Sequence, residues 1–543
     1  MSAPSSVADR MAEFRRRGWW RDETFLDDLR RQAVERPRKL AIAGRRLDEA
    51  RTDTLDYAEL SRLTDRFAGA LLELGVERGD VVAVQLPNRW EMVPLMFACM
   101  AAGAVICPIA PVCQEEELRH RLALTEARVF ITVAEYQGYQ LATTVRDLRD
   151  QLAVDHVVVV DGHAPEGTVD FHDLFVARHW EKERMGQLEG RALRPDEPFV
   201  ILFTSGTTGF SKGVVHSQNT VHSGVRGYVD TFLLRDDLVA VVTNPMVHYS
   251  GFGQGILAAV ILGGTAVFQD GPNHAGLLDL IERYHGTLLY GPPPTLSGIA
   301  RVQQNDPRDI SSLRHTVTGA APVLQSLVDE LRDTLGARTY SVWGMSEFGP
   351  VTISRLDYNQ NWSAHSHGRP IDSMEIRIDA CQDPTKRASV GRLRVRGASQ
   401  ALGYFKQQDV FDAELGADSW FDTGDVARED GRGGIRVLGR AKDAIMRDGI
   451  VLPMAELEAA ISAHPQVAEA AIVGPTGHID DTILVVLVAR DDDPPTLEEI
   501  RSHLRGAGQD VRFLPERLEI MTALPKTLTG KVRKVELRKL FAG

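Results

Sequence analysis

Residues 200–216 carry the side chains whose types and spacing are most suggestive of chemistry. Four apolar residues, Val200 to Phe203, run into a segment of hydroxyl and glycine residues that ends near Lys212. A buried strand ending in such a turn directs several backbone N–H groups at one point, and phosphate is the usual anion bound there. Gly206 and Gly209 permit positive φ and close approach. The predicted phosphate-binding residues are Thr204, Ser205, Gly206, Thr207, Thr208, Gly209 and Lys212.

The spacing of this loop differs from that of a P-loop NTPase. A Walker A loop needs glycine, four residues and then Gly-Lys-Ser/Thr, whereas Lys212 lies between Ser211 and Gly213. An ordinary polar surface turn is the alternative interpretation. That alternative does not explain why so many hydroxyls and glycines, with one lysine, directly follow a buried strand.

Together with this loop, six later segments resemble the motifs of the adenylate-forming superfamily, in the same order and over nearly the whole chain. That superfamily contains acyl-CoA synthetases, adenylation domains of peptide synthetases and firefly luciferase. The segments are Thr318-Gly-Ala-Ala-Pro322, Tyr340-Ser-Val-Trp-Gly-Met-Ser-Glu347, His367-Gly-Arg-Pro370, Trp420-Phe-Asp-Thr-Gly-Asp425, Gly439-Arg440 and Pro525-Lys-Thr-Leu-Thr-Gly-Lys531. Ser211, Trp343 and Ser346 depart from the usual Pro, Tyr and Thr.

The resemblance implies activation of a carboxylic acid with ATP to acyl-AMP and pyrophosphate, followed by thioester formation with coenzyme A. It implies that Lys531 bridges the substrate carboxylate and the α-phosphate, that Glu347 binds Mg²⁺, and that Asp425 binds the ribose. The other nucleotide-binding residues that it implies are Gly319, Ala320, Ala321, Trp343, Gly344, Met345, Ser346 and Arg440.

The chemistry of these residues agrees with such a reaction. Both reactants are anions, so their repulsion must be cancelled and the charge on the phosphate oxygens must be held. A hard cation held by phosphate and one carboxylate, here Glu347, is a usual arrangement. Without the resemblance, the sequence predicts that Asp425 is a turn residue after Thr423-Gly424 and that Lys531 is a surface lysine.

The acyl pocket is predicted along the segment Asn244 to Gly255, with His248, Tyr249, Phe252 and Gly253 as lining residues. His248 is the candidate for a catalytic side chain at the pocket floor, and a hydrogen-bonded core histidine is the alternative. The segment contains no acidic residue to bind an α-amine. The expected substrate therefore lacks an α-amine. Phe252, Gly253, Trp343 and Ala320 leave an apolar slot, which favours an aliphatic or alicyclic acid. The segment Arg17 to Thr24, with this pocket, resembles the cyclohexanecarboxylate-CoA ligase branch.

After Arg440, the resemblance implies a hinge at Lys442 and a loop that lines the channel for the thiol acceptor. Relatives usually have two glycines in that loop, whereas this chain has Asp448-Gly449. A carboxylate adds bulk and negative charge beside an anionic thiol donor. Slow transfer to CoA is one expectation, with acyl-AMP passed to a carrier protein or acyltransferase in trans. The other expectation is that Asp448 points to solvent and the loop still supports transfer to CoA.

Alternating strand and helix patterns predict an α/β fold with parallel sheets covered by helices. A large adenylating domain is expected over 1–440 and a small mobile α+β lid domain over 441–543. Strands are predicted at 81–86, 105–108, 129–133, 156–160, 239–243, 265–268, 470–473 and 483–488, and helices at 60–74, 92–102, 454–461 and 497–504.

Composition limits the classes of function and partner. A formal net charge of −13 argues against nucleic-acid binding. Four cysteines without Cys-x-x-Cys spacing predict free thiols in a reducing, cytoplasmic compartment. The prolines and glycine in the apolar stretch 92–113 predict a helix, a turn and a strand rather than a membrane span. Monomer and homodimer are both open, and a non-catalytic nucleotide-binding protein is disfavoured by the intact Lys212, Glu347 and Lys531.

Overall fold

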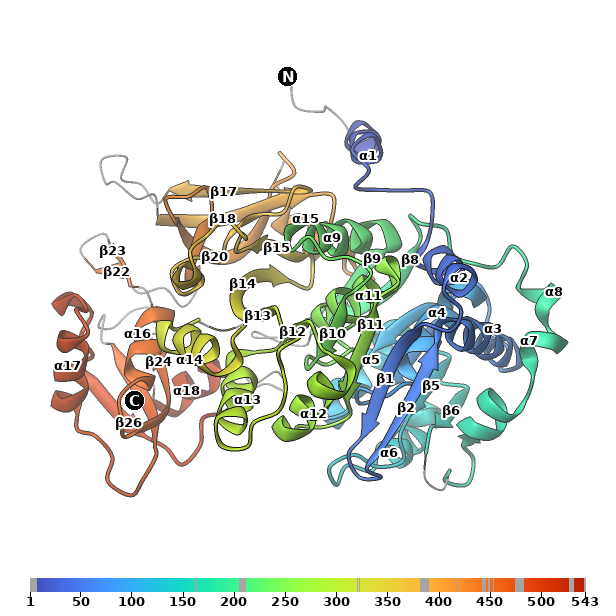
Figure 1. Cartoon of the computed structure of the whole chain (residues 1–543), viewed down its shortest axis with the longest axis horizontal. Coiled ribbons are helices and arrows are strands. Elements are labelled where there is room, and N and C mark those ends of the chain that lie inside the picture. Colours follow the sequence, from blue (N-terminus) through green and yellow to red (C-terminus); the bar gives the residue numbers. More distant parts are fainter. Residues whose placement is uncertain are drawn as a thin grey trace.

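The computed structural model describes residues 7–161, 164–204, 211–319, 321, 323–380, 390–416, 418–441, 446–447, 450–452, 454–473, 483–526 and 532–541. Two large sheets form the body of the molecule, a smaller antiparallel sheet lies beside them, and a compact C-terminal domain lies at one end (Figure 1). The α/β class expected from the alternating pattern is confirmed.

The first large sheet has nine strands, in the order β16-β15-β14-β13-β12-β10-β11-β1-β2. Its centre, from β14 to β1, is parallel, and both edges are antiparallel. Its strands are Arg369–Pro370, Gly349–Ile353, Arg338–Met345, His315–Gly319, Leu288–Tyr290, Val239–Val242, Thr265–Gln269, Leu40–Arg46 and Arg51–Asp56, in that order.

The second large sheet has eight strands, in the order β19-β9-β8-β4-β3-β5-β6-β7. It is parallel from β8 to β7, and β9 and β19 extend it in antiparallel fashion. Its strands are Gly403–Tyr404, Gly213–Ser217, Pro198–Phe203, Val105–Pro108, Val81–Gln85, Val129–Thr132, His156–Val159 and Val169–Asp170, in that order.

Alternating side chains of these strands divide between three hydrophobic cores. In β10, Ala240 and Val242 face the core shared by both sheets, whereas Val241 faces a second core. In β3, Val82 faces the shared core and Ala83 faces a third. Strands that are buried on both faces read as continuous apolar runs, which is why the sequence predicts them well.

Helices fill the shared core and cover the two outer faces. α2 (Phe25–Glu35), α3 (Tyr57–Glu73), α4 (Met92–Ala102), α9 (Gln218–Thr231) and α11 (Ala258–Leu262) contribute to the shared core. α12 (His274–Tyr284), α13 (Pro293–Asn305) and α14 (Gln325–Leu335) cover the nine-stranded sheet. α5 (Glu115–Thr125) and α6 (Leu141–Leu148) cover the eight-stranded sheet. The remaining helices of this part are α1 (Val7–Arg16), α7 (Trp180–Glu183), α8 (Met185–Leu188), α10 (Tyr249–Gly251) and α15 (Gln408–Glu414).

A third, antiparallel sheet lies beside the nine-stranded sheet and contacts the C-terminal domain through α16, and the expectation of parallel sheets did not include it. Its order is β17-β18-β20-β21. Its long alternating strands carry charged residues on one face, such as the Arg394 that pairs with Asp422 and Asp379. The strands are Met374–Ala380, Val390–Gly397, Phe421–Glu429 and Ile435–Arg440.

The C-terminal domain packs helices on both faces of a three-stranded sheet, β24-β25-β26. α16 and α17 cover one face and α18 the other. An ion pair of 3.0 Å between Arg436 in β21 and Glu456 in α16 joins this domain to the third sheet. The elements are β22 Met446–Arg447, β23 Ile450–Val451, α16 Met454–Ser462, β24 Val467–Val473, β25 Leu484–Ala489, α17 Leu497–Gly506, β26 Arg517–Ile520 and α18 Lys534–Phe541.

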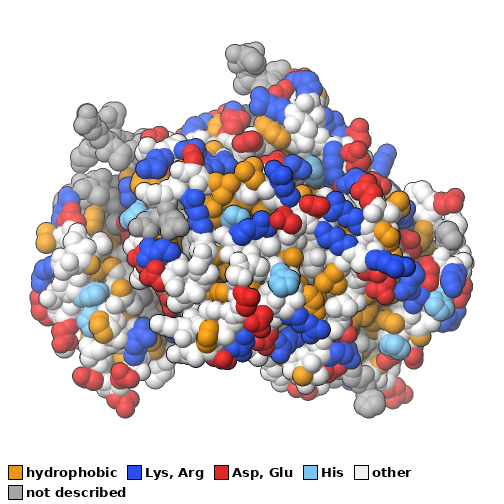
Figure 2. All heavy atoms as spheres, in the orientation of Figure 1, with side chains coloured by type: hydrophobic (Ala, Val, Ile, Leu, Met, Phe, Trp, Pro, Cys, Tyr) orange, Lys and Arg blue, Asp and Glu red, His pale blue; other side chains and the backbone are white. Residues whose placement is uncertain are grey.

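The surface agrees with the composition. Acidic and basic side chains are interspersed over the face shown in Figure 2. Cys99, Cys107 and Cys113 are buried free thiols, as predicted. Within the described ranges, every helix is too short or too polar to cross a membrane, and the stretch 92–113 forms α4, a turn and β4.

Candidate functional site

The predicted site residues gather where the strands of both large sheets end at their carboxyl termini. Thr204 directly follows β8, Gly319 ends β13, and Trp343, Gly344 and Met345 end β14. Side chains from different strands meet at this edge of an α/β sheet, and ligands bind there in open α/β folds. The topology therefore brings together residues that are more than one hundred positions apart.

The described ends of the predicted phosphate loop are tied together. The Thr204 backbone N–H donates to the Lys212 carbonyl (3.0 Å), and the Lys212 N–H donates to the Thr204 hydroxyl (3.2 Å). Ser205, Gly206, Thr207, Thr208 and Gly209 lie outside the described residues. The two bonds fix where the loop leaves and rejoins the sheet.

Ser211, which stands where relatives have proline, is buried and held by α5. Its hydroxyl bonds Glu117 and accepts from Arg121 Nε (3.2 Å), while its carbonyl oxygen lies 3.2 Å from His120 Nε2. The Arg121 guanidinium also stacks on Phe203 at 4.8 Å. Side-chain contacts thus constrain a position that a proline ring would constrain covalently.

Glu347 lies at the centre of the site and is almost completely buried. Its Oε1 accepts a 2.8 Å hydrogen bond from the Tyr404 hydroxyl, which comes from the edge strand β19. Burial raises the pKa of Glu347, although the Tyr404 bond and the cations Lys212 and Arg440 oppose that rise. The neighbouring groups therefore do not fully compensate the negative charge of ionised Glu347, and a cation bound beside this carboxylate would stabilise it.

Tyr404 also holds the phosphate-loop lysine. The Lys212 ammonium lies 4.3 Å from the centre of the Tyr404 ring. A single aromatic side chain thus contacts both the predicted cation of the phosphate loop and the predicted metal ligand. Sequence reasoning missed Tyr404, because its partner Glu347 is 57 positions away in the sequence.

His216 supports the segment that leads into Glu347, and sequence reasoning missed it too. Its Nε2 donates to the Ser346 carbonyl (2.7 Å), and its Nδ1 lies 2.9 Å from the Thr220 hydroxyl. Complete burial lowers the pKa of His216 to about 4. The ring is therefore neutral at neutral pH and acts as a fixed donor.

Asp425 and Arg440 face each other across two neighbouring strands. They are register partners in β20 and β21, with 3.3 Å between Arg440 Nε and Asp425 Oδ1. The turn expected at Asp425 was wrong, because Thr423 to Asp425 lie inside strand β20, where Gly424 has a φ of +74° and the register shifts. Arg440 also donates to the Thr423 carbonyl (2.7 Å). The pair presents a fixed carboxylate near the ends of β14 and β19.

A cavity of about 640 Å³ opens between the two large sheets, beside these groups. Gly344, Met345 and Ser346 line it on the side of Glu347, and His248 and Tyr249 line another wall. Phe252, which is 2% exposed, and Gly253 both pack against Tyr249. The described residues that line the cavity do not include Phe252, Gly253 or Trp343. The lining is more polar than an apolar slot, with Asn88, Thr243, Gln254, Gln269, Asp270, His274 and Tyr290 among it.

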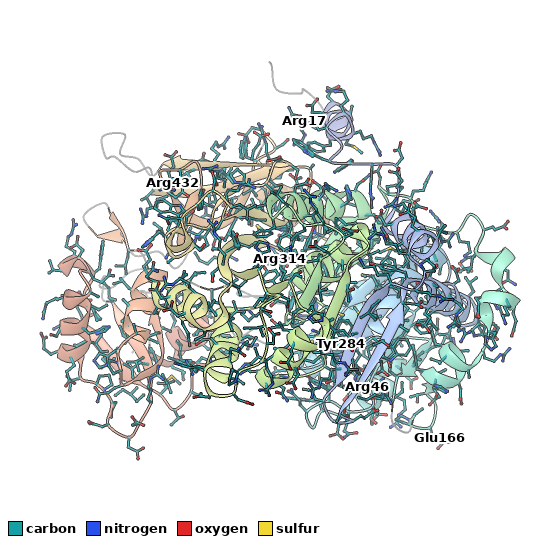
Figure 3. The ribbon with its side chains drawn as sticks, viewed as in Figure 1. Arg17, Arg46, Glu166, Tyr284, Arg314 and Arg432 are labelled. Carbon is teal, nitrogen blue, oxygen red and sulfur yellow. The ribbon has the colours of Figure 1, made fainter. Side chains whose placement is uncertain are left out.

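An ionic network connects the two large sheets beside this cavity, which Asp270 lines. Arg89 pairs with Asp161 and, at 3.5 Å, with the cavity residue Asp270. Arg46, labelled in Figure 3 beside β1 and β2, pairs with the buried Glu91. Burial raises the pKa of Glu91 to about 7 despite the Arg46 contact. These charges fix the position of one sheet against the other.

Several predicted residues fall outside the described part of the chain: Ala320, Lys442, Asp448, Gly449 and Lys531. Ala321 is described and exposed, beyond the end of β13. Lys526 and Val532, the described residues on either side of 527–531, form an isolated β-bridge. Among the described residues, no group of three or more His, Cys, Asp or Glu side chains is placed to hold a metal ion.

Comparison with known proteins identifies the family. The AMP-binding enzyme family matches residues 29–405, and the AMP-binding enzyme C-terminal domain matches residues 456–531. The chain therefore belongs to the AMP-binding enzymes, the adenylate-forming superfamily whose motifs it carries. Its relatives within that family are of two kinds.

The chain is 27% identical over 534 residues to a medium-chain fatty-acid–CoA ligase of Escherichia coli K12, covering 98% of this chain and 92% of that protein. It is 30% identical over 534 residues to a salicyl-AMP ligase / salicyl-S-ArCP synthetase of Mycobacterium tuberculosis, covering 97% and 92%. Its fold matches the anthranilate CoA ligase AuaEII in complex with anthranoyl-AMP, with a TM-score of 0.83, 22% identity and coverage of 96% and 97%.

Proposed function

We propose that this enzyme activates a small carboxylic acid with ATP, forming acyl-AMP and pyrophosphate. A carboxylate oxygen of the acid attacks the α-phosphorus of ATP. The bond from that phosphorus to the oxygen bridging the α- and β-phosphates breaks, and pyrophosphate leaves with that oxygen. The observation that carries the proposal is the buried Glu347. It is bonded to Tyr404 beside Lys212, and it directly follows the cavity-lining residues Gly344 to Ser346.

The described residues support defined roles in this reaction. Thr204 and Lys212 hold the ends of a loop suited to the β- and γ-phosphates, and Asp425 offers a carboxylate to the ribose hydroxyls, with Arg440 beside it. A ribose hydroxyl is a donor, so a fixed carboxylate is a suitable acceptor. His248 borders the space for the acid.

Magnesium fits this site as an ion held chiefly by nucleotide phosphates. Mg²⁺ is usually bound by one or two carboxylates together with substrate phosphates and water. Glu347 supplies one buried carboxylate, and burial raises its pKa even though Lys212 and Arg440 lie near it. When bound, the ion would neutralise phosphate charge, while Tyr404 holds the Glu347 carboxylate in place.

The proposal includes a division of labour between residues 1–440 and residues 441–543. Lys531, on the C-terminal domain, would bridge the acid and the α-phosphate, and Lys442 would be the pivot between the two half-reactions. Support comes from the matching C-terminal family domain and from the ion pairs of the described residues across the boundary, where Arg436 and Arg428 of the third sheet both pair with Glu456 of α16. A joint with few contacts suits domain movement.

Two acceptors are open for the second half-reaction: coenzyme A, or a carrier protein or acyltransferase in trans. The relatives include both a CoA ligase and a salicyl-AMP ligase. Asp448 in the acceptor loop favours weak transfer to CoA, because its charge repels an anionic thiol donor. Rates of acyl-CoA formation by wild type and Asp448→Gly distinguish the two. Rapid transfer by wild type that Asp448→Gly does not improve would establish CoA as the acceptor.

Acid-dependent exchange of labelled pyrophosphate into ATP tests the first half-reaction directly. We expect exchange with at least one member of a panel of aliphatic, alicyclic and aromatic acids. Lys531→Ala should lower the exchange rate by about a hundredfold, the scale for losing one preorganised charge. Lys526→Ala, which removes a lysine paired with Glu469 in the same segment, is the matched control. An absence of exchange with every acid would contradict the proposal.

A further inference from the structure

Helix α5 lies against both ends of the predicted phosphate loop. Its Leu118 and Leu122 are buried in the hydrophobic core that also contains Phe203, the last residue of β8. The loop leaves the sheet after Phe203 and rejoins it where β9 begins at Gly213. Core packing therefore fixes the helix next to the two strands that the loop connects.

Three polar side chains of α5 contact these loop ends and are called here the α5 clamp: Glu117, His120 and Arg121. They are spaced at i, i+3 and i+4, so they lie on one face of the helix. The buried hydroxyl of Ser211 donates to the Glu117 carboxylate and accepts from Arg121 Nε (3.2 Å). The Ser211 carbonyl accepts from His120 Nε2 (3.2 Å). The hydroxyl and the carbonyl of Ser211 are therefore both held by one helix.

An ion pair inside the α5 clamp joins the two ends of the loop. Arg121 Nε lies 2.9 Å from Glu117 Oε1, and the Arg121 guanidinium stacks on the Phe203 ring at 4.8 Å. The Arg121 side chain is only 11% exposed, so solvent screens this pair weakly. Charge-assisted hydrogen bonds of this kind are stronger than neutral ones. One guanidinium thus links Ser211 at the exit of the loop with Phe203 at its entry.

A second ion pair on the same helix provides a comparison. Glu115 and Arg119 have the same i, i+4 spacing and the same 2.9 Å separation, but their side chains are 57% and 46% exposed. Exposed pairs of this kind contribute little to stability. A difference between the two pairs therefore separates the contact with the loop from the general effect of removing a charged residue from α5.

Ser211 directly precedes Lys212, the predicted cation of the loop. The Lys212 backbone exchanges two hydrogen bonds with Thr204, and its ammonium lies over the Tyr404 ring. A serine does not restrict its own backbone, whereas a proline ring fixes φ at about −65°. At position 211 the backbone is therefore held by tertiary contacts with the α5 clamp. A change of conformation there would displace Lys212.

We propose that Glu117 and Arg121 are positioning residues for ATP binding: by holding Ser211, they set the backbone of Lys212 and the loop ends for the β- and γ-phosphates. The inference rests on the proposed function, in which that loop binds ATP. Without the α5 clamp, part of the binding free energy of ATP would be used to order the loop. The affinity for ATP therefore depends on an ion pair in α5.

Calorimetric titration with ATP and magnesium, in the absence of any acid, tests the inference. Glu117→Ala and Arg121→Met should each weaken ATP binding by about tenfold, because the loop is no longer ordered in advance. The controls Glu115→Ala and Arg119→Met should stay within about twofold of wild type, as expected for an exposed pair. Thermal unfolding checks that all four variants are folded.

Changes at Ser211 separate positioning from a general effect on stability. Ser211→Pro restores the constraint within the loop itself, so in that background Glu117→Ala should weaken ATP binding by less than about threefold. Ser211→Ala removes the hydroxyl and should weaken binding as Glu117→Ala does. The two changes together should cost no more than either alone, because they break the same contact. A proline in another segment would not correct a mere destabilisation of α5.

Several outcomes would overturn the inference. They are equal ATP affinity in Glu117→Ala and Glu115→Ala, additive losses when Glu117→Ala is combined with Ser211→Ala, and a loss in Glu117→Ala that Ser211→Pro does not reduce. Loss of ATP binding in Ser211→Pro alone would also contradict it, because the ring and the α5 clamp would then not fix the same conformation.

The inference and the proposed function can fail separately. A wild-type protein that binds ATP and shows these effects, but exchanges pyrophosphate with no acid, would contradict the proposed function and leave the positioning role standing. A wild-type protein that does not bind ATP would contradict both.

Discussion

The hydroxyl of Tyr404 donates a 2.8 Å hydrogen bond to Oε1 of Glu347, and the Lys212 ammonium lies 4.3 Å above the same Tyr404 ring. This contact joins the edge strand β19 to the residue that follows β14, so it connects the two large sheets at the site. Tyr404 is therefore a positioning residue for the proposed metal ligand and for the phosphate-loop lysine.

Tyr404→Phe should lower the rate of adenylation about tenfold while the fold is retained, because a hydrogen bond to a charged group contributes roughly 1.5–3 kcal/mol. The ring that Lys212 contacts remains.

The Tyr404 bond lowers the pKa of Glu347, so its loss raises that pKa further. The acid limb of the pH–rate profile should then move to higher pH. Tyr139→Phe, at an exposed tyrosine, should shift nothing. An unmoved acid limb in Tyr404→Phe would rule out the positioning role.

Asp425→Ala should raise the apparent KM for ATP more than it lowers kcat. A ribose contact is made in both the ground state and the transition state, so its loss weakens binding uniformly. Titration of ATP in the exchange assay measures this effect. Asp418→Ala removes an exposed partner of Arg377 in the same part of the chain and serves as the control. An unchanged ATP affinity in Asp425→Ala would show that Asp425 does not hold the ribose.

Gly349→Ala should impair acid binding through Tyr249. Gly349 has a φ of +65°, and an added Cβ would lie 2.3 Å from the Tyr249 ring, which lines the cavity. Strained backbone and a displaced ring should together lower thermal stability and raise the KM for the acid several-fold. The matched control is Gly336→Ala, which has the same φ but open space around its Cβ and should show only the backbone cost. Identical KM values in the two variants would contradict the steric role.

His216 should make the enzyme less stable in acid. Its folded pKa of about 4 lies below the unfolded value of about 6.5, so the unfolded state binds more protons between these pH values. Stability is therefore fully present above pH 6.5 and falls as the pH drops toward 4, by roughly 2 kcal/mol at pH 5 for this group alone. Denaturant unfolding at pH 7 and pH 5 measures the loss.

His216→Gln should flatten that pH dependence, whereas His503→Gln in the C-terminal domain should preserve it. An equally steep loss of stability in His216→Gln would show that other groups cause it. His222, His315 and His367 also have pKa values lowered by burial, so a residual slope is expected.

The sequence predicted the parts of the molecule that local patterns determine. α4 and β4 begin and end at the predicted residues, because continuous apolar runs mark elements buried on all sides. The ordered motifs likewise predicted Lys212, Glu347, Asp425 and Arg440, which the fold brings to one edge of the sheets. The position of Asp425 inside a strand was not predicted, because nothing local distinguishes a strand with a bulge from a turn at Gly424.

Long-range contacts were not accessible from sequence patterns. Tyr404 and His216 act on residues 57 and 130 positions away, and no periodicity records such a pairing.

Transfer of oxygen-18 from the acid to AMP tests the central claim most directly. The acid would carry oxygen-18 at both carboxylate positions, and hydroxylamine would trap the activated acyl group, releasing AMP for mass spectrometry. Attack of the carboxylate on the α-phosphorus of ATP leaves one carboxylate oxygen in the phosphate of AMP. Activation through acyl-AMP therefore predicts AMP with a single oxygen-18 atom for each hydroxamate formed. Unlabelled AMP, or label in inorganic phosphate with release of ADP, would contradict it.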